Sequence, residues 1–212
     1  MNHVELTPDL ILQAYANGVF PMAESREDDS LFWVDPRERG IIPLDGFHVS
    51  RSLARLIRQE RYSVTLNRDF AGVMEGCADR PETWINTTIF DLYCQLHDMG
   101  FGHSIEVWDG ERLVGGTYGL ALGTAFFGES MFSRVPNASK LALAWLVARL
   151  RLTGFTLFDT QFLTEHLASL GGIEIPRARY SALLRKALET RADITALDAP
   201  LTPELVLSVC RR

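Results

Sequence analysis

The chain has 212 residues, 47% of them hydrophobic, and a formal net charge of −6 at pH 7. This length allows one or two domains with a substantial core, and the acidic balance argues against a protein that coats nucleic acid through its overall charge. The start of the chain lacks a basic segment followed by an apolar run, and no apolar run reaches the ~18 residues of a membrane span. We therefore expect a cytoplasmic protein.

The first predicted element is a short helix in the stretch LTPDLILQAYANG, residues 6–18. Thr7 is placed to cap its N-terminus, Pro8 fits the first helical position, and Asn17-Gly18 is a stop signal. Residues 19–47 then form a turn-rich stretch that contains three prolines, at positions 21, 36 and 43. The pattern predicts a small N-terminal domain, residues 1–46, and a second domain, residues 47–212.

A basic helix is predicted to open the second domain, in the stretch HVSRSLARLIRQER at residues 48–61. Ser50 can cap its N-terminus. Arg51, Arg55 and Arg58 fall at i, i+4 and i+7, which places them on one helical face. Such a stripe is most often a solvated surface, but it is also our candidate for contact with an RNA backbone.

The rest of the chain is predicted to alternate between strands and helices. Strands are expected at residues 62–67, 104–108, 112–120, 124–132, 155–162 and 173–176, and helices at 87–100, 137–154, 163–172 and 177–189. Asp109-Gly110 and Gly123 fit the turns of an antiparallel meander, and Asn137 is placed to cap the long helix. This order predicts an α+β fold of the kind used by acetyl-CoA-dependent N-acyltransferases of the GNAT type.

The loop that would bind coenzyme A in such a fold reads SRVPNASK, residues 133–140. Phosphates bind there to bare N–H groups of a glycine-rich turn at a helix N-terminus. This loop has no glycine, Pro136 lacks an N–H group, and the branched side chain of Val135 obstructs close approach. We therefore expect no coenzyme A site and no cofactor. If the protein transfers an acyl group, a molecule other than coenzyme A should carry that group.

Several blocks of the sequence resemble the leucyl/phenylalanyl-tRNA–protein transferase family. They are YANGVFPM, FHVSRS, the run from GFGHSIEVW to GESMFSRVPNASKLAL, and FDTQFLTEHLASLGGIEIPRARY, in this order from about residue 5 to residue 185. The resemblance implies a small N-terminal domain followed by an acetyltransferase-like domain. It also implies transfer of Leu or Phe, with Met as a further candidate, from aminoacyl-tRNA to proteins that begin with Arg or Lys, in the bacterial N-degron pathway.

By this resemblance, Asp159 and Gln161 are the catalytic pair that assists attack of the substrate amine on the aminoacyl ester. Residues i and i+2 of a strand share a face, so both side chains can reach one cleft while Thr160 points away. Because an α-amine titrates near pH ~8, the Gln161 carboxamide needs only to orient it, and Asp159 could hold the NH₂ group of that carboxamide.

The resemblance implies three further groups of binding residues. Glu129 and Asp159 would bind the basic N-terminal residue of the acceptor, although without the family a salt bridge at the rim would explain Glu129. Trp33 and Trp84 would stack on the terminal adenosine of tRNA. The aminoacyl pocket would be lined by Thr117, Phe126, Gly128, Leu143, Leu146, Leu150 and Phe158. The three leucines also fit ordinary core packing, and Thr117 stands where Met is common, which bears on the choice among Leu, Phe and Met.

The expected partners are the 3′ end of an aminoacyl-tRNA and proteins with an N-terminal Arg or Lys, and the expected state is a monomer. No histidine spacing suggests a metal site, and Cys77, Cys94 and Cys210 match neither a disulfide framework nor a metal motif. Two other functions stay open. One is a coenzyme A-dependent N-acetyltransferase, which the 133–140 loop disfavours. The other is a non-catalytic RNA-binding module, which would not need the Asp-x-Gln pair.

Overall fold

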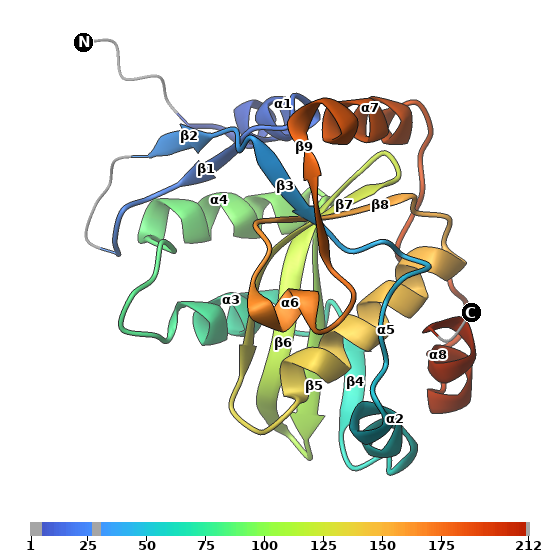
Figure 1. The fold of residues 1–212 in the computed structure, drawn as a ribbon. Coiled ribbons are helices and arrows are strands. Elements are labelled where there is room, and N and C mark those ends of the chain that lie inside the picture. Colours follow the sequence, from blue (N-terminus) through green and yellow to red (C-terminus); the bar gives the residue numbers. More distant parts are fainter. Residues whose placement is uncertain (1–5, 27–30, 211–212) are drawn as a thin grey trace, which may run out of the picture.

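A seven-stranded sheet forms the centre of the computed structural model, which describes residues 6–26 and 31–210 (Figure 1). The strands lie in the order β4 (Ser63–Leu66), β5 (Gly102–Asp109), β6 (Arg112–Leu122), β7 (Ala125–Ser133), β8 (Leu157–Gln161), β3 (Glu38–Ile41) and β9 (Ile173–Pro176). Neighbours from β4 to β7 are antiparallel, β7 and β8 are parallel, and β3 is antiparallel to β8 and β9. This mixed, mostly antiparallel sheet confirms the predicted α+β class and meander.

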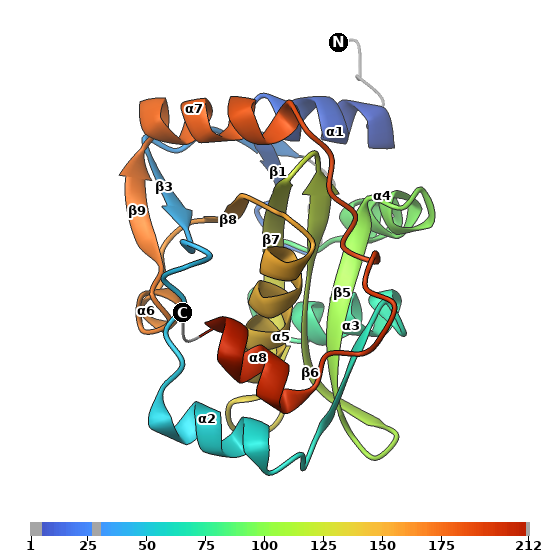
Figure 2. The same cartoon turned by 90° about the vertical axis from the view of Figure 1, so that its right-hand side faces the viewer.

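Helices cover both faces of the sheet, as the two cartoon views show (Figures 1 and 2). One face carries α2 (Arg51–Arg58), α5 (Ala138–Leu152) and α8 (Pro203–Cys210), and we call it the α5 side. The other carries α1 (Pro8–Ala16), α3 (Phe70–Ala78), α4 (Thr87–Asp98) and α7 (Arg177–Leu188), and we call it the α4 side. A short helix, α6 (Glu165–Ala168), follows β8. No helix in the described ranges is long and apolar enough to span a bilayer.

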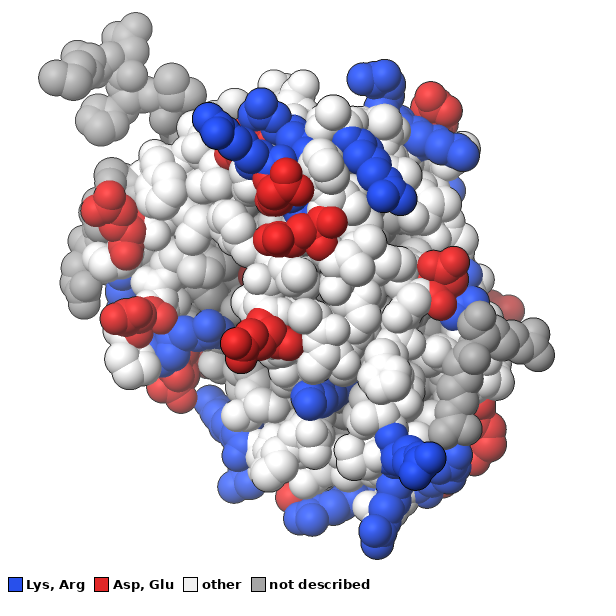
Figure 3. Space-filling view, viewed as in Figure 1, with Lys and Arg blue, Asp and Glu red and all other residues white. Residues whose placement is uncertain are grey.

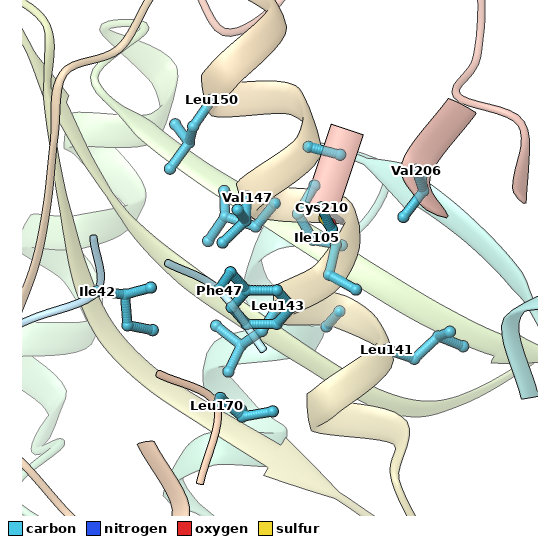
Figure 4. Close-up of a cluster of buried hydrophobic side chains, with 14 of the residues drawn as sticks. Ile42, Phe47, Ile105, Leu141, Leu143, Val147, Leu150, Leu170, Val206 and Cys210 are labelled. Atoms are coloured by element: carbon cyan, nitrogen blue, oxygen red, sulfur yellow. The ribbon is translucent and has the colours of Figure 1, made fainter. Parts of the chain in front are cut away.

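Each face of the sheet has its own hydrophobic core. Phe126 and Phe127 are consecutive residues of β7, and Phe126 packs on the α5 side while Phe127 packs on the α4 side. This follows from the strand geometry, because successive side chains point to opposite faces. Figure 4 shows part of the core on the α5 side, where Leu143 and Val147 of α5 lie close to Phe47. The same alternation determines on which face of the sheet each polar residue farther along β7 and β8 lies.

The turn-rich stretch before residue 47 contains more regular structure than its prolines suggested. β1 (Phe20–Met22) pairs with β2 (Phe32–Val34) in a separate two-stranded sheet, whereas β3 lies between β8 and β9 in the main sheet. Gly40 of β3 permits this position, because a Cβ atom there would lie 2.6 Å from the backbone carbonyl carbon of Phe162. The boundary near residue 46 stays a prediction, but the strand just before it is part of the sheet that carries the site.

The predicted helix starts were correct at two positions and wrong at a third. Thr7 Oγ1 accepts a hydrogen bond from the Leu10 N–H group, and Ser50 Oγ accepts one from Leu53. Asn137 adopts a left-handed conformation with φ of 68° and makes no capping bond with its side chain. Ser133 Oγ instead accepts the hydrogen bond of the Ser139 N–H group at 2.8 Å, so the cap comes from the end of the preceding strand.

Candidate active site

A cavity of about 450 Å³ opens where β7 and β8 separate. The hydrogen-bonded register of these parallel strands ends at Phe127 and Asp159. The residues that follow, Gly128 and Glu129 on β7 and Thr160 and Gln161 on β8, all line the cavity. Because successive residues point to opposite faces, the cavity has walls on both sides of the sheet. We call the part lined by residues of the α5 side and the part lined by residues of the α4 side its two compartments.

Glu129 and Gln161 form the polar centre of the compartment on the α4 side. The Gln161 carboxamide donates from Nε2 to both carboxylate oxygens of Glu129, at 3.1 Å each. Tyr15 and Tyr93 donate their hydroxyl groups to the same carboxylate at 2.7 and 3.1 Å. Since a carboxylate accepts only from the NH₂ end of an amide, the Gln161 Oε1 atom faces away from Glu129. That oxygen is placed to accept a hydrogen bond from a bound molecule.

Glu129 has no cationic partner among the described residues. The ion pairs within 4.0 Å in the described ranges involve other residues, and Glu129 is only 8% exposed. Burial raises the pKa of the Glu129 carboxyl group from 4.5 to about 7, although its hydrogen bonds with Tyr15, Gln161 and Tyr93 act in the opposite direction. A buried carboxylate held only by neutral donors has unused capacity to bind a positive charge at the cavity wall.

Asp159 lies behind the cavity wall and is fully buried. Arg39 donates to it from Nε and from Nη2, the latter at 2.7 Å, and Tyr180 donates its hydroxyl group at 2.6 Å. The remaining contact comes from the backbone N–H group of Gln161, at 2.8 Å. Asp159 thus holds the main chain of Gln161, whereas Glu129 holds its carboxamide. The expectation that Asp159 holds the Gln161 NH₂ group is therefore corrected.

Gln161 adopts a left-handed backbone conformation with φ of 63°. Such a conformation costs a residue other than glycine about 1–2 kcal/mol. The hydrogen bond from its N–H group to Asp159 and the pairing of its backbone with Gly40 of β3 hold it in place. Strain of this kind persists where the surroundings fix it, as they do in many functional sites.

Thr160 lines the cavity, contrary to the expectation that it points away from the cleft. Phe158 packs in the core on the α5 side and Leu157 in the core on the α4 side, so alternation places Thr160 with Phe158. The prediction that Thr160 points away from its two neighbours follows the strand pattern. It pointed to the wrong conclusion because the cavity extends through the gap between the strands to the opposite face.

The predicted aminoacyl pocket is divided between cavity wall and core. Thr117, Gly128, Leu143 and Phe158 line the cavity. Phe126, Leu146 and Leu150 are buried in the core on the α5 side and are not part of the wall. Leu167 adds an apolar surface that the sequence did not single out. The compartment on the α5 side therefore has an apolar lining suited to an aliphatic or aromatic side chain.

The two candidate tryptophans differ in position. Trp84 lines the cavity, whereas Trp33 lies on β2, is 42% exposed and does not line it. The arginines Arg51, Arg55 and Arg58 lie on α2, and all three are exposed. Figure 3 shows basic side chains gathered at the lower right, over α2. The stripe is thus a surface of its own, apart from the residues that line the cavity.

Four residues that surround the two carboxylates were not among the predicted site residues, namely Tyr15, Arg39, Tyr93 and Tyr180. Tyr15 belongs to the block YANGVFPM, and its hydroxyl group lies 2.6 Å from that of Tyr93. Buried carboxylates need hydrogen-bond donors, so the sequence indicates that such partners exist for Glu129 and Asp159. The sequence gives no indication of which tyrosines and which arginine supply them, because the partners lie far apart in the chain.

The loop between β7 and α5 has little free capacity for phosphate. The Ala138 N–H group donates to the carbonyl of Val135 at 3.3 Å, and that of Ser139 donates to Ser133 Oγ. These two donors at the start of α5 are thus engaged within the loop. This geometry agrees with the interpretation of the SRVPNASK stretch, although the lack of a coenzyme A site stays a prediction.

Two family models match this chain. A family model described as leucyl/phenylalanyl-tRNA protein transferase matches residues 41–185, and the model of that family's N-terminal domain matches residues 4–37. Among solved structures, FemX has a TM-score of 0.47 and 14% identity, with 84% of this chain and 71% of that chain covered.

Curated relatives resemble the chain over most of its length. The leucyl/phenylalanyl-tRNA–protein transferase of Dinoroseobacter shibae is 61% identical over 198 residues, which cover 93% of this chain and 89% of the relative. The enzyme of a Ruegeria species is 61% identical over 202 residues, covering 95% and 96%. That of Cereibacter sphaeroides is 65% identical over 188 residues, covering 89% and 88%. The chain belongs to the leucyl/phenylalanyl-tRNA–protein transferase family.

Proposed function

We propose that this protein transfers a leucyl or phenylalanyl group from tRNA to the α-amine of a protein that begins with Arg or Lys. Binding of a basic acceptor residue is supported by Glu129. This residue is a buried carboxylate at the cavity wall, and it has no cationic partner among the described residues. The family supplies the aminoacyl-tRNA donor. The two compartments of the cavity would receive the two substrates.

The donor's side chain fits the compartment on the α5 side. Leu143 and Phe158 supply apolar walls, and Gly128 leaves room between them. The Thr117 hydroxyl group donates to the carbonyl of Ser130 at 2.9 Å, so its hydrogen-bonding capacity as a donor is already used. A charged side chain would lose its hydration there without a partner, which disfavours it strongly. Leu and Phe fit, and Met is a further candidate.

The acceptor's basic residue would bind at Glu129 on the α4 side. A charge-assisted hydrogen bond between its positive side chain and this carboxylate is favoured because neutral groups surround the carboxylate. Asp159 was also a candidate for this contact, but its oxygens are engaged by Arg39, Tyr180 and the Gln161 backbone. In our proposal Asp159 is a positioning residue that acts through Gln161.

Gln161 would orient the attacking amine. Its Oε1 atom, turned away from Glu129, would accept a hydrogen bond from the neutral α-amine and direct the nitrogen lone pair to the ester carbonyl. The new bond joins that nitrogen to the carbonyl carbon, the bond from this carbon to the ribose oxygen breaks, and the amine proton passes to the leaving oxygen. An amide is more stable than an ester, so the ester itself supplies the free energy.

The tRNA would be held at its terminal adenosine and along its backbone. Trp84 would stack on the adenine, because aromatic stacking tolerates the open geometry of a single-stranded end. Trp33 stays a candidate from the resemblance alone. Arg51, Arg55 and Arg58 would contact phosphates away from the cavity through charge rather than base identity.

The decisive experiment gives the purified protein labelled Leu-tRNA or Phe-tRNA together with peptides that begin with Arg, Lys or Ala. We expect the label to move to the Arg and Lys peptides and not to the Ala peptide. Absence of transfer to the Arg peptide would refute the proposal, and so would equal transfer to the Ala peptide. A chemically aminoacylated tRNA with a charged side chain serves as the donor control.

A further inference from the structure

Two polar atoms on the α5 side of the cavity have no hydrogen-bond partner within the described ranges. They are Thr160 Oγ1 and His166 Nε2, and both are buried. A buried polar group without a partner costs about 1–3 kcal/mol, so proteins seldom keep one without a use. Both residues line the cavity. No described residue offers these atoms a hydrogen bond, so we look for their partner among molecules that enter the cavity.

Each of the two residues is a direct chain neighbour of another residue that lines the cavity. Leu167, the neighbour of His166, packs in the same core as Leu143 and Phe158. Thr160 directly precedes Gln161 and lies on the Phe158 side of β8. They therefore border the place where a side chain bound among Leu143 and Phe158 joins the rest of the donor.

The donor's α-carbon carries three groups that must all be accommodated. In the proposed function, the side chain enters the apolar compartment and the ester carbonyl lies at the gap between β7 and β8. The third group is the donor's own α-amine, which is left beside Thr160 and His166. An amine needs hydrogen-bond acceptors, and both a hydroxyl oxygen and a neutral imidazole nitrogen supply them.

His166 is suited to this task because its ring stays neutral. Burial and the nearby charge of Lys140 lower the pKa of the His166 imidazole. A neutral ring with its proton on Nδ1 has a lone pair on Nε2. Without a negative charge of its own, the pair would not compete with Glu129 for the basic residue of the acceptor. The two amines would then bind in separate compartments.

We propose that Thr160 Oγ1 and His166 Nε2 form a subsite for the free α-amino group of the aminoacyl donor. This inference rests on the proposed function and deepens it, because it adds a requirement on the donor. A donor whose α-amine is missing or acylated leaves both atoms unpaired. The protein should therefore distinguish aminoacyl-tRNA from N-acylated tRNA that carries the same side chain.

The test compares two donors with the same side chain and the same ester, Phe-tRNA and 3-phenylpropionyl-tRNA, which lacks the amine. With an Arg peptide as acceptor, Thr160→Val and His166→Phe should each lower kcat/KM for Phe-tRNA about tenfold, the effect of removing one hydrogen bond. Both variants should leave kcat/KM for 3-phenylpropionyl-tRNA nearly unchanged. Thr160→Ser keeps the hydroxyl group and should retain the preference for Phe-tRNA.

Two results would overturn the assignment of these atoms to the donor's α-amine. The first is an equal loss for both donors, which would mean a structural role. The second is a loss that disappears only when the terminal adenosine lacks its 2′-hydroxyl group, which would assign the atoms to the ribose. Thr153→Val, which removes a hydroxyl group at the far end of α5, is the matched control. If wild-type protein moves no phenylalanine at all, the proposed function itself fails.

Discussion

Asp159 and Glu129 are two buried carboxylates around one glutamine, and they differ in how their charge is compensated. Asp159 is paired with Arg39 and bonded to Tyr180, whereas Glu129 receives only neutral donors from Tyr15, Tyr93 and Gln161. Asp159 lies behind the cavity wall and Glu129 is part of it. The fully compensated charge of Asp159 fixes the backbone, while the uncompensated charge of Glu129 beside a cavity is available for a substrate.

A buried carboxylate without a cationic partner is not always available for a substrate, as Glu106 shows. Glu106 on β5 is fully buried and bonded to the hydroxyl groups of Thr65 and Ser104, and the described residues offer it no cation either. It does not line the cavity that contains Gln161. The lack of a cation thus indicates a binding role only where a cavity brings the substrate to the carboxylate, and Glu106→Gln becomes a useful control for Glu129→Gln.

The largest expected effect comes from breaking the compensated pair. Arg39→Met leaves Asp159 buried without its cation, and removing one partner of a buried ion pair typically costs about 3–5 kcal/mol. Unfolding in urea should show a loss of this size. The double variant Arg39→Met with Asp159→Leu should recover part of it, because no unpaired charge remains. A loss below about 1 kcal/mol would show that Asp159 is not held by charge pairing.

Glu129→Gln should increase stability at high pH and reduce activity. The folded protein binds the Glu129 proton more tightly than the unfolded chain, because the pKa rises from 4.5 to about 7. Wild-type stability therefore falls as pH increases through this range, and the variant escapes a cost of roughly 3 kcal/mol above it. The difference in free energy of unfolding between variant and wild type should be clearly larger at pH 8 than at pH 5.

The same substitution should lower kcat/KM with an Arg peptide about 100-fold, since it removes a charge-assisted contact. Glu106→Gln should leave the ratio of Arg-peptide to Ala-peptide transfer unchanged. A Glu129→Gln variant that keeps full activity on the Arg peptide would place acceptor recognition elsewhere.

A smaller effect on stability separates the contribution of the Gln161 side chain from that of its strained backbone. Gln161→Ala and Gln161→Gly both remove the carboxamide, and both should lower kcat more than the affinity for tRNA. At a φ of 63° the glycine variant should be more stable than the alanine variant by about 1 kcal/mol. Thermal unfolding of the pair measures this difference. Equal stability would mean that the backbone is not strained.

The smallest effect on folding is expected at the surface stripe of α2. Replacing Arg51, Arg55 and Arg58 with Gln should change stability by less than about 0.5 kcal/mol. It should weaken tRNA binding at low salt. The slope of the logarithm of the binding constant against the logarithm of the salt concentration should become less steep by ~0.7–0.9 for each phosphate that these side chains neutralise. The matched control removes three exposed charges from α7, at Arg179, Arg185 and Lys186. Equal weakening by both sets would indicate a general charge effect rather than a specific interaction.

The meander and the long helix could be predicted because their signals are local. The hairpin forms where the turn pattern indicated, although its two-residue turn is Gly110-Glu111, because Asp109 still pairs with Arg112, and the apolar run of α5 is buried along its length. β3 could not be predicted in the same way, since four residues with a charged start, Glu38 and Arg39, do not look like an inner strand. Its place depends on strands made more than a hundred residues later.

The sequence indicated which residues belong to the site better than how those residues are arranged. The resemblance supplied Glu129, Gln161 and Asp159, but strand periodicity alone could not reveal that β7 and β8 separate beside them. That separation brings Thr160 into the cavity and leaves Asp159 outside it. The left-handed Gln161 and the Arg39 partner are tertiary features, because Gly40 supports the first and Arg39 lies 120 residues from Asp159.

The position of β3 also sets a time at which the site can form. Arg39 and Asp159 are 120 residues apart, and β3 needs both β8 and β9 beside it. At a synthesis rate of about 5–20 residues per second, β3 would wait roughly 7–27 s on the ribosome until β9 is complete. The early part of the chain must remain soluble during that interval with Arg39 unpaired. A nascent chain released before β9 is made should therefore lack a competent cavity.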